Sequence, residues 1–126
     1  YSPCALGATI NDTTINQLKC SIIAGAANNQ LMDEKLHGEI LFQKGIVYAP
    51  DYLINAGGVM NCYAEIHDIS DAKVMDMAGN IYQTTIDILT SSRNENIPSS
   101  LAANRLAEKR INDESKSLNK CWIEDI

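Results

Sequence analysis

The 126-residue sequence predicts an α/β fold in which part of a parallel sheet is followed only by helices. Two short apolar runs, at 20–24 and 46–49, have the length of buried strands, and helical patterns alternate with them along the chain. Strands and helices that alternate in this way are joined by crossovers, which make neighbouring strands parallel. From about Ser70 onward the pattern is helical throughout, so we expect no further strand there.

Start and stop signals divide the first part of the chain into elements. The first two residues are expected to finish a strand before Pro3, which has no backbone N–H to donate. The pair at 11–12, Asn-Asp, is suited to cap a short helix over 13–18. The strand at 20–24 is then expected to end at Gly25.

A second strand and helix follow in the same rhythm. Asp33 can cap a helix that extends to Lys44, because the apolar positions in it recur at helical spacing. Gly45 suits the left-handed position after that helix. The next strand, at 46–49, is expected to stop at Pro50.

The C-terminal part is predicted to be two helices. The first covers 70–90, and the polar segment 91–98 is expected to form the turn after it. One of the serines at 99–100 can cap the second helix, over 101–111. The remaining tail is polar and expected to fray, although the segment 121–123, Cys-Trp-Ile, could dock on a neighbour.

Composition excludes several classes of protein. A formal net charge of −6 and a pI near 4.7 argue against nucleic-acid binding, because such proteins gather Lys and Arg on one face. No apolar run approaches the ~20 residues of a membrane span. The scattered cysteines, Cys4, Cys20, Cys62 and Cys121, lack metal-ligand spacing and indicate a reduced, cytoplasmic setting. Their spacing alone does not exclude a disulfide between spatial neighbours.

The loops that follow the strands carry the functional signal. They read PCALGATIND, GAANNQ and APDYLINAGGVMN, and all three combine small residues with Asn. Ligands bind to open parallel sheets outside the carboxyl ends of the strands, so these loops could hold a nucleotide. The alternative is that Gly25, Gly57 and Gly58 serve only turns and helix packing. From the residues alone, the prediction is a ligand-binding α/β half-domain.

Longer strings closely resemble the Glu/Leu/Phe/Val amino-acid dehydrogenase family: PCALGATIND, KCSIIAGAANNQL, GIVYAPDYLINAGGVMN and LAANRLAEKRI. Within that family the resemblance is closest to the leucine-oxidising members. It implies a Rossmann-like, doubly wound parallel sheet, of which residues 1–69 would form the second half. Residues 70–126 would be C-terminal helices that pack on this half and reach toward a substrate domain.

The resemblance implies oxidative deamination of an L-amino acid to its 2-oxo acid and ammonia, with hydride transfer to NAD. It also implies a fragment that is inactive alone, because the family's catalytic lysines lie in an N-terminal substrate domain. No residue of this chain matches a catalytic motif, and the sequence contains no GxGxxG turn. NADP is not excluded, since the residue that meets the 2′ position lies upstream. The expected partners are the missing N-terminal part, the amino acid or oxo acid, and further copies in a homo-oligomer.

By resemblance, the cofactor-binding residues are Pro3, Cys4, Ala5, Leu6, Ala26, Ala27 and Asn28. The first four would lie beside the adenosine side and the last three near the nicotinamide ribose. Asn29 resembles the residue whose amide points at the substrate. Two structural alternatives stay open. Cys4 could be a buried core residue, and both asparagines could merely cap the following helix.

Two further positions bear on substrate choice. Val59 lines the side-chain pocket by resemblance, and Cys62 stands where glutamate-specific relatives have a serine. A thiol does not compensate the desolvation of a carboxylate, so glutamate is disfavoured and a branched-chain substrate fits best. The alternatives are a glutamate or phenylalanine dehydrogenase fragment, or a non-catalytic module that binds a nucleotide or a protein.

Overall fold

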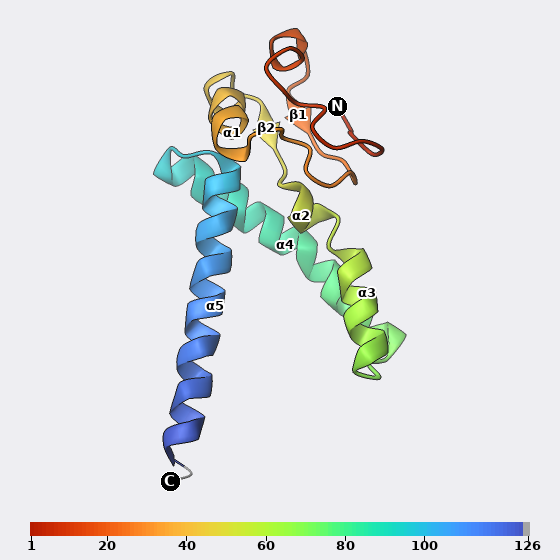
Figure 1. Ribbon diagram of the computed structural model, residues 1–126, viewed down its shortest axis with the longest axis vertical. Helices are drawn as coiled ribbons and strands as arrows, with labels where there is room; N and C mark the ends of the chain where they lie inside the picture. The colour runs from red at the N-terminus through yellow and green to blue at the C-terminus, as the bar shows by residue number, and fades with distance from the viewer. Residues whose placement is uncertain (125–126) are drawn as a thin grey trace.

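The computed structural model describes the backbone of residues 1–124 and the side chains of residues 1–115. Its elements are the 3-10 helix η1 (Ile15–Gln17), strands β1 (Ile22–Ile23) and β2 (Val47–Tyr48), and helices α1 (Glu34–Gln43), α2 (Asp51–Ile54), α3 (Gly57–Ile66), α4 (Asp71–Glu95) and α5 (Ser99–Glu124). The sheet and α1 gather at one end, α3 leads away from them, α4 runs back along α3, and α5 diverges from α4 (Figure 1). The predicted α/β class is confirmed.

The two strands pair in parallel, as the alternating pattern predicts. Ile22 pairs with Val47 and Ile23 with Tyr48, so the regular pairing is shorter than either apolar run. The first residues form no regular strand, and that prediction is wrong. Tyr1 nevertheless lies beside β1, because its carbonyl accepts from the Ala24 N–H at 3.1 Å. The sheet therefore presents two strands and one extended segment side by side.

The main core lies on one side of this sheet, against α1. Its buried members are Ile10, Ile15, Ile23, Leu31, Leu41, Ile46 and Tyr48. The alternate strand residues point the other way: Ile22 is 58% exposed and Val47 is 42% exposed. One face of this sheet is therefore bare in the described part of the chain. Parallel sheets are normally covered on both faces, so a bare face is unusual.

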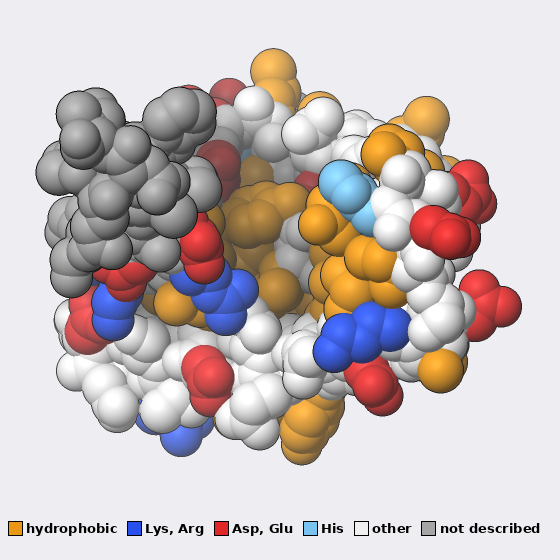
Figure 2. Space-filling view, turned by 90° about the horizontal axis from the view of Figure 1, so that it is seen from below, with side chains coloured by type: hydrophobic (Ala, Val, Ile, Leu, Met, Phe, Trp, Pro, Cys, Tyr) orange, Lys and Arg blue, Asp and Glu red, His pale blue; other side chains and the backbone are white. Residues whose placement is uncertain are grey.

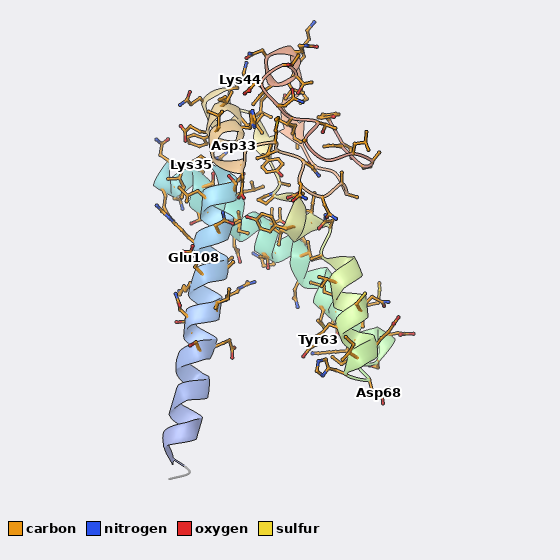
Figure 3. All side chains as sticks on the ribbon, viewed as in Figure 1. Asp33, Lys35, Lys44, Tyr63, Asp68 and Glu108 are labelled. Carbon is orange, nitrogen blue, oxygen red and sulfur yellow. The ribbon has the colours of Figure 1, made fainter. Side chains whose placement is uncertain are left out.

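Helix α1 begins and ends at its predicted signals. The Asp33 carboxylate accepts from the Leu36 N–H at 2.8 Å, which confirms the cap. Gly45 follows the helix with φ of +69°, a conformation that side chains disfavour, as predicted. Buried His37 ties the helix start to the preceding loop, because its Nδ1 accepts from the Asp33 N–H and its Nε2 donates to Asp12 at 3.1 Å. Asp33 and Lys44 mark the two ends of α1 in Figure 3.

Two predictions of helix length are wrong. The first short helix is only the 3-10 turn η1, because the Asn11 side chain accepts from both the Thr13 and Thr14 N–H groups and holds a tighter turn. Helix α4 runs on to Glu95 through the segment expected to be a turn. The hydroxyl of buried Ser92 donates to the Ile97 carbonyl at 2.5 Å and closes the end of the helix.

The start of α5 also differs from expectation. Ser99 is already inside the helix, and its hydroxyl donates to the Tyr48 carbonyl at 2.6 Å instead of capping. The helix backbone continues to Glu124, past the predicted end at 111. The expected docking segment, 121–123, lies outside the residues whose side chains are described. Among the described residues, no helix is both long and apolar enough to cross a membrane.

Candidate functional site

The three loops predicted to bind a ligand lie together at the carboxyl ends of the strands. The first loop runs beside the second, since the Ala27 N–H donates to the Pro3 carbonyl at 3.0 Å and the Ala8 N–H to the Asn29 carbonyl at 2.7 Å. The third loop reaches the second through Asn55, whose side-chain amide donates to the Ala26 carbonyl at 3.3 Å. The predicted convergence of the loops is confirmed.

Gly25 permits the close approach of the first two loops. A Cβ atom at this position would lie 2.2 Å from the Pro3 carbonyl oxygen and 2.6 Å from the Pro3 nitrogen. Both are backbone atoms, so neither can turn aside as a side chain could. The packing interpretation is therefore correct for Gly25. Gly57 and Gly58 have nothing within 4 Å of a Cβ position, so packing does not require them.

Two buried polar side chains fix the second loop from inside, and sequence analysis missed both. The Gln30 amide donates to the Gly25 carbonyl at 2.6 Å and to the Ala27 carbonyl at 3.0 Å. The buried Asp51 carboxylate accepts from the Gln30 N–H at 3.2 Å and from the Tyr52 N–H at 2.9 Å. This cluster gives the loop one shape, because each donor in it has a fixed partner.

The two asparagines of the loop do not cap the following helix. Asp33 performs that task, so the capping interpretation is wrong. Asn29 has φ of +52°, a left-handed conformation that Asn tolerates better than other side chains, and it is exposed. The exposed Asn28 carboxamide accepts from the Asn55 amide at 2.5 Å. Both side chains lie at the surface of the loop.

The other expected cofactor-binding residues divide by exposure. Pro3 and Ala27 are buried, whereas Cys4, Ala5, Leu6 and Ala26 are exposed. Cys4 is therefore not core filler. The backbone N–H of Ala26 and then the Ser2 hydroxyl, at 3.2 Å from the sulfur, lower the pKa of the Cys4 thiol. Polar groups of two loops thus meet at this sulfur.

Two of the three expected substrate-binding residues, Val59 and Cys62, lie on α3, whereas Asn29 lies on the second loop. Val59 and Cys62 are one helical turn apart, and Tyr63 and Ile66 continue the same exposed face. We call these four residues the α3 stripe. Val59 is 68% exposed and Ile66 is 79% exposed, so the stripe is open to solvent along its length. The ring of Tyr63, labelled in Figure 3, packs against the His67 ring at a tilt of 41°, with ring centres 4.3 Å apart.

Two hollows lie apart from the first two loops, and residues of the third loop line one of them. A groove of about 660 Å³ runs between α2, the start of α3, α4 and α5, and its apolar floor is visible in Figure 2. A second hollow of about 570 Å³ is lined by α1, β2 and the end of α4. Neither of these two hollows is lined by residues 24–29. We call the surface formed by the three loops the shelf.

Residues 1–118 match the family model described as Glutamate/Leucine/Phenylalanine/Valine dehydrogenase. The chain belongs to this family. The match covers all three loops of the shelf and most of the C-terminal helices of this family member.

Individual dehydrogenases of the family are similar to this chain over most of its length. A leucine dehydrogenase from Thermoactinomyces intermedius is 50% identical over 111 residues, which is 88% of this chain and 30% of that enzyme. The crystal structure of L-tryptophan dehydrogenase from Nostoc punctiforme superposes with a TM-score of 0.86 and 47% identity, covering 91% of this chain and 34% of that one. A phenylalanine dehydrogenase from Bacillus thermotolerans is 43% identical over 92% of this chain and 30% of its own length. The chain spans about a third of the length of these relatives.

Proposed function

We propose that this chain is part of an L-amino-acid dehydrogenase that oxidises an amino acid to its 2-oxo acid and ammonia. Residues 1–69 would be the second half of its nicotinamide-nucleotide-binding domain, and residues 70–126 its C-terminal helices. The observation that carries the proposal is the position of Asn55. Its side-chain amide donates to the second loop, which is expected to meet the cofactor. Asn55 also stands two residues before α3, which is expected to meet the substrate. One cleft could therefore serve both ligands.

The residues of the shelf fit the nicotinamide end of such a cofactor. Cys4, Ala5 and Ala26 offer small exposed side chains, which allow a flat ring and a ribose to approach. Asn28 and Asn29 offer neutral hydrogen-bonding groups, which orient a ligand without adding charge. When bound, NAD would accept the hydride removed from the amino acid.

The proposal also requires further polypeptide. This chain would supply no catalytic lysine, so a substrate domain in the same polypeptide would face the shelf across the cleft. The exposed α3 stripe and the bare face of the sheet support this, because apolar surface of this kind normally has a neighbour. They also argue against a stand-alone binding module. We expect the complete protein to form a homo-oligomer in the cytoplasm.

The side chains on α3 favour an aliphatic substrate. Val59 would narrow the pocket, and the Cys62 thiol would leave a substrate carboxylate without a strong donor. Leucine, isoleucine and valine fit such a pocket, whereas glutamate does not. Tryptophan and phenylalanine are the competing substrates, since relatives named for them match this chain almost as well.

The test is reduction of NAD by the complete polypeptide with leucine, valine, phenylalanine, tryptophan and glutamate in parallel. Shape selection of this kind gives discrimination of about 10 to 200-fold per group, so kcat/KM for leucine should exceed that for glutamate at least tenfold. Val59→Ala should move the preference toward phenylalanine. Gln43→Ala, on the exposed face of α1, is the matched control and should change nothing. Preference for glutamate would refute the specificity argument, and absence of turnover would refute the proposed function.

A further inference from the structure

We propose that α4 is a contact surface for a second copy of this chain, paired antiparallel about a two-fold axis near the middle of the helix. The inference goes beyond the proposed function, because it concerns assembly and uses no residue of the shelf. Small and apolar residues on α4 recur at alternating spacings of three and four, the repeat that forms a seam between two helices. We call this set the α4 seam, which consists of Ala72, Met75, Gly79, Tyr82, Ile86 and Leu89.

The α4 seam lies open to solvent along most of its length. Met75 is 72% exposed, Tyr82 is 73% exposed and Ile86 is 41% exposed, whereas Leu89 is half-buried. Another face of the helix packs inside the chain, where Ile88 is buried with residues of α5. The seam spans about 26 Å of helix, at 1.5 Å per residue. Exposed apolar surface on this scale normally marks a site of contact.

The two ends of the seam have complementary shapes. Near the end of α4, Ile86 and Leu89 border the hollow of about 570 Å³ whose other walls come from α1 and β2. Near the start of α4, the long Met75 side chain is exposed. A two-fold axis midway between Gly79 and Tyr82 sets Met75 of one copy opposite Ile86 of the other. Met75 can then enter the hollow, and its flexible thioether adapts to an irregular space.

The same axis pairs the other seam residues. Gly79 of one copy faces Tyr82 of the other, and Ala72 faces Leu89, so each of these layers sets a small residue against a large one. Every contact occurs twice, as a two-fold interface requires. Parallel pairing would instead set Tyr82 against Tyr82 and leave a gap between the two Gly79 positions, which close packing disfavours.

Charge also favours the antiparallel direction. Between positions 68 and 76 the chain has three aspartates, Asp68, Asp71 and Asp76, and one lysine. At the other end of α4, Arg93 lines the hollow and Lys44 ends α1 beside it. Figure 3 shows Lys44 and Asp68 at opposite ends of this part of the molecule. Antiparallel pairing brings the acidic end of each copy to the basic end of the other, whereas parallel pairing would place like charges together.

Cysteine cross-linking of the complete polypeptide tests the register. Met75→Cys and Ile86→Cys proteins are mixed and oxidised in air, and linked peptides are identified by mass spectrometry. Because the register sets these positions opposite each other, a disulfide between positions 75 and 86 should form. Met75→Cys alone is the control, since its two copies of position 75 would lie about 16 Å apart along the helices, beyond the reach of a disulfide. A link between the two positions 75 would indicate parallel helices and overturn the inference.

Analytical ultracentrifugation of the complete polypeptide tests whether the seam holds two copies together. Tyr82→Glu buries a carboxylate at the centre of the pair, so the dissociation constant should rise roughly a hundredfold or more and the mass should fall to half. The variant should keep the far-UV circular dichroism of the wild type, because Tyr82 is exposed in the single chain. Lys109→Glu, on the exposed side of α5, adds negative charge away from the seam and should keep the wild-type mass.

The outcomes separate this inference from the proposed function, because NAD reduction is measured on the same preparations. Turnover without a link between positions 75 and 86 would overturn the inference alone, and a link without turnover would overturn the proposed function alone. An unchanged mass of Tyr82→Glu would also overturn the inference. A lower melting temperature would then assign the seam to packing within one polypeptide, and an unchanged one would assign it to solvent. The link together with a halved mass supports the inference.

Discussion

The contact between Gly25 and Pro3 gives a stability prediction that can be worked from distances. In Gly25→Ala the new methyl group would meet the Pro3 backbone at 2.2 Å, whereas ordinary contact begins at 3.4 Å, so the two loops must separate by roughly 1 Å. The flanking hydrogen bonds, Ala24 N–H to Tyr1 at 3.1 Å and Ala27 N–H to Pro3 at 3.0 Å, would then be too long to persist.

The expected loss combines two effects. Overpacking costs about 1 to 3 kcal/mol, and each of the two hydrogen bonds contributes about 1 kcal/mol. The free energy of unfolding should therefore fall by about 3 to 5 kcal/mol. It is measured by urea unfolding of the complete polypeptide, followed by far-UV circular dichroism.

A second glycine provides the control for this measurement. Gly79 lies within α4 with nothing within 4 Å of its Cβ position. Gly79→Ala should therefore stabilise the protein by up to about 1 kcal/mol through helix propensity alone. A Gly25→Ala protein within about 0.5 kcal/mol of the wild type would refute the reasoning, because that is the range of inert surface changes.

Two further predictions concern exposed groups of the shelf. Asn29→Gly should keep the wild-type stability and Asn29→Ala should lose about 1 kcal/mol in thermal unfolding, because φ is +52° there. Both variants should lower kcat/KM for the amino acid roughly tenfold, as loss of one hydrogen bond predicts. A loss of kcat/KM in Asn29→Ala but not in Asn29→Gly would contradict this, because it would show that only the backbone conformation of Asn29 matters. The Cys4 thiol should react with iodoacetamide half-maximally at a lower pH than a free cysteine. The Ala26 N–H and the Ser2 hydroxyl lower its pKa, so the reactive thiolate appears earlier as pH rises. Peptide mass spectrometry measures this rate, with N-acetylcysteine as reference, and a midpoint at or above the reference would contradict it.

Features set by local chemistry could be predicted from the sequence. The Asp33 cap and the left-handed Gly45 depend on a few neighbouring residues, and both appear as expected. The parallel pairing of the strands follows from the helix between them. The convergence of three loops then follows, because parallel strands end at the same edge.

Features set by distant partners could not be predicted in this way. Gln30 and Asp51 are polar, and polar residues are expected at the surface. Both are nevertheless buried and in contact, although their positions in the sequence differ by 21. The segment after Thr90 is rich in serine, which resembles a turn, but Ser92 finds its partner in the Ile97 carbonyl only once the helix has continued. Asn55 shows no local sign of its contact with Asn28, which lies 27 positions earlier.

The brevity of α2 has a consequence for how this family can vary. Helix α2 has only four residues, so three residues separate the buried Asp51 from Asn55, and each helical residue turns the chain by about 100°. One inserted residue would swing Asn55 away from Asn28 and rotate Val59 out of line with the loop. The length of this connection should therefore be inherited unchanged, and new substrate preferences should arise by replacing side chains along α3.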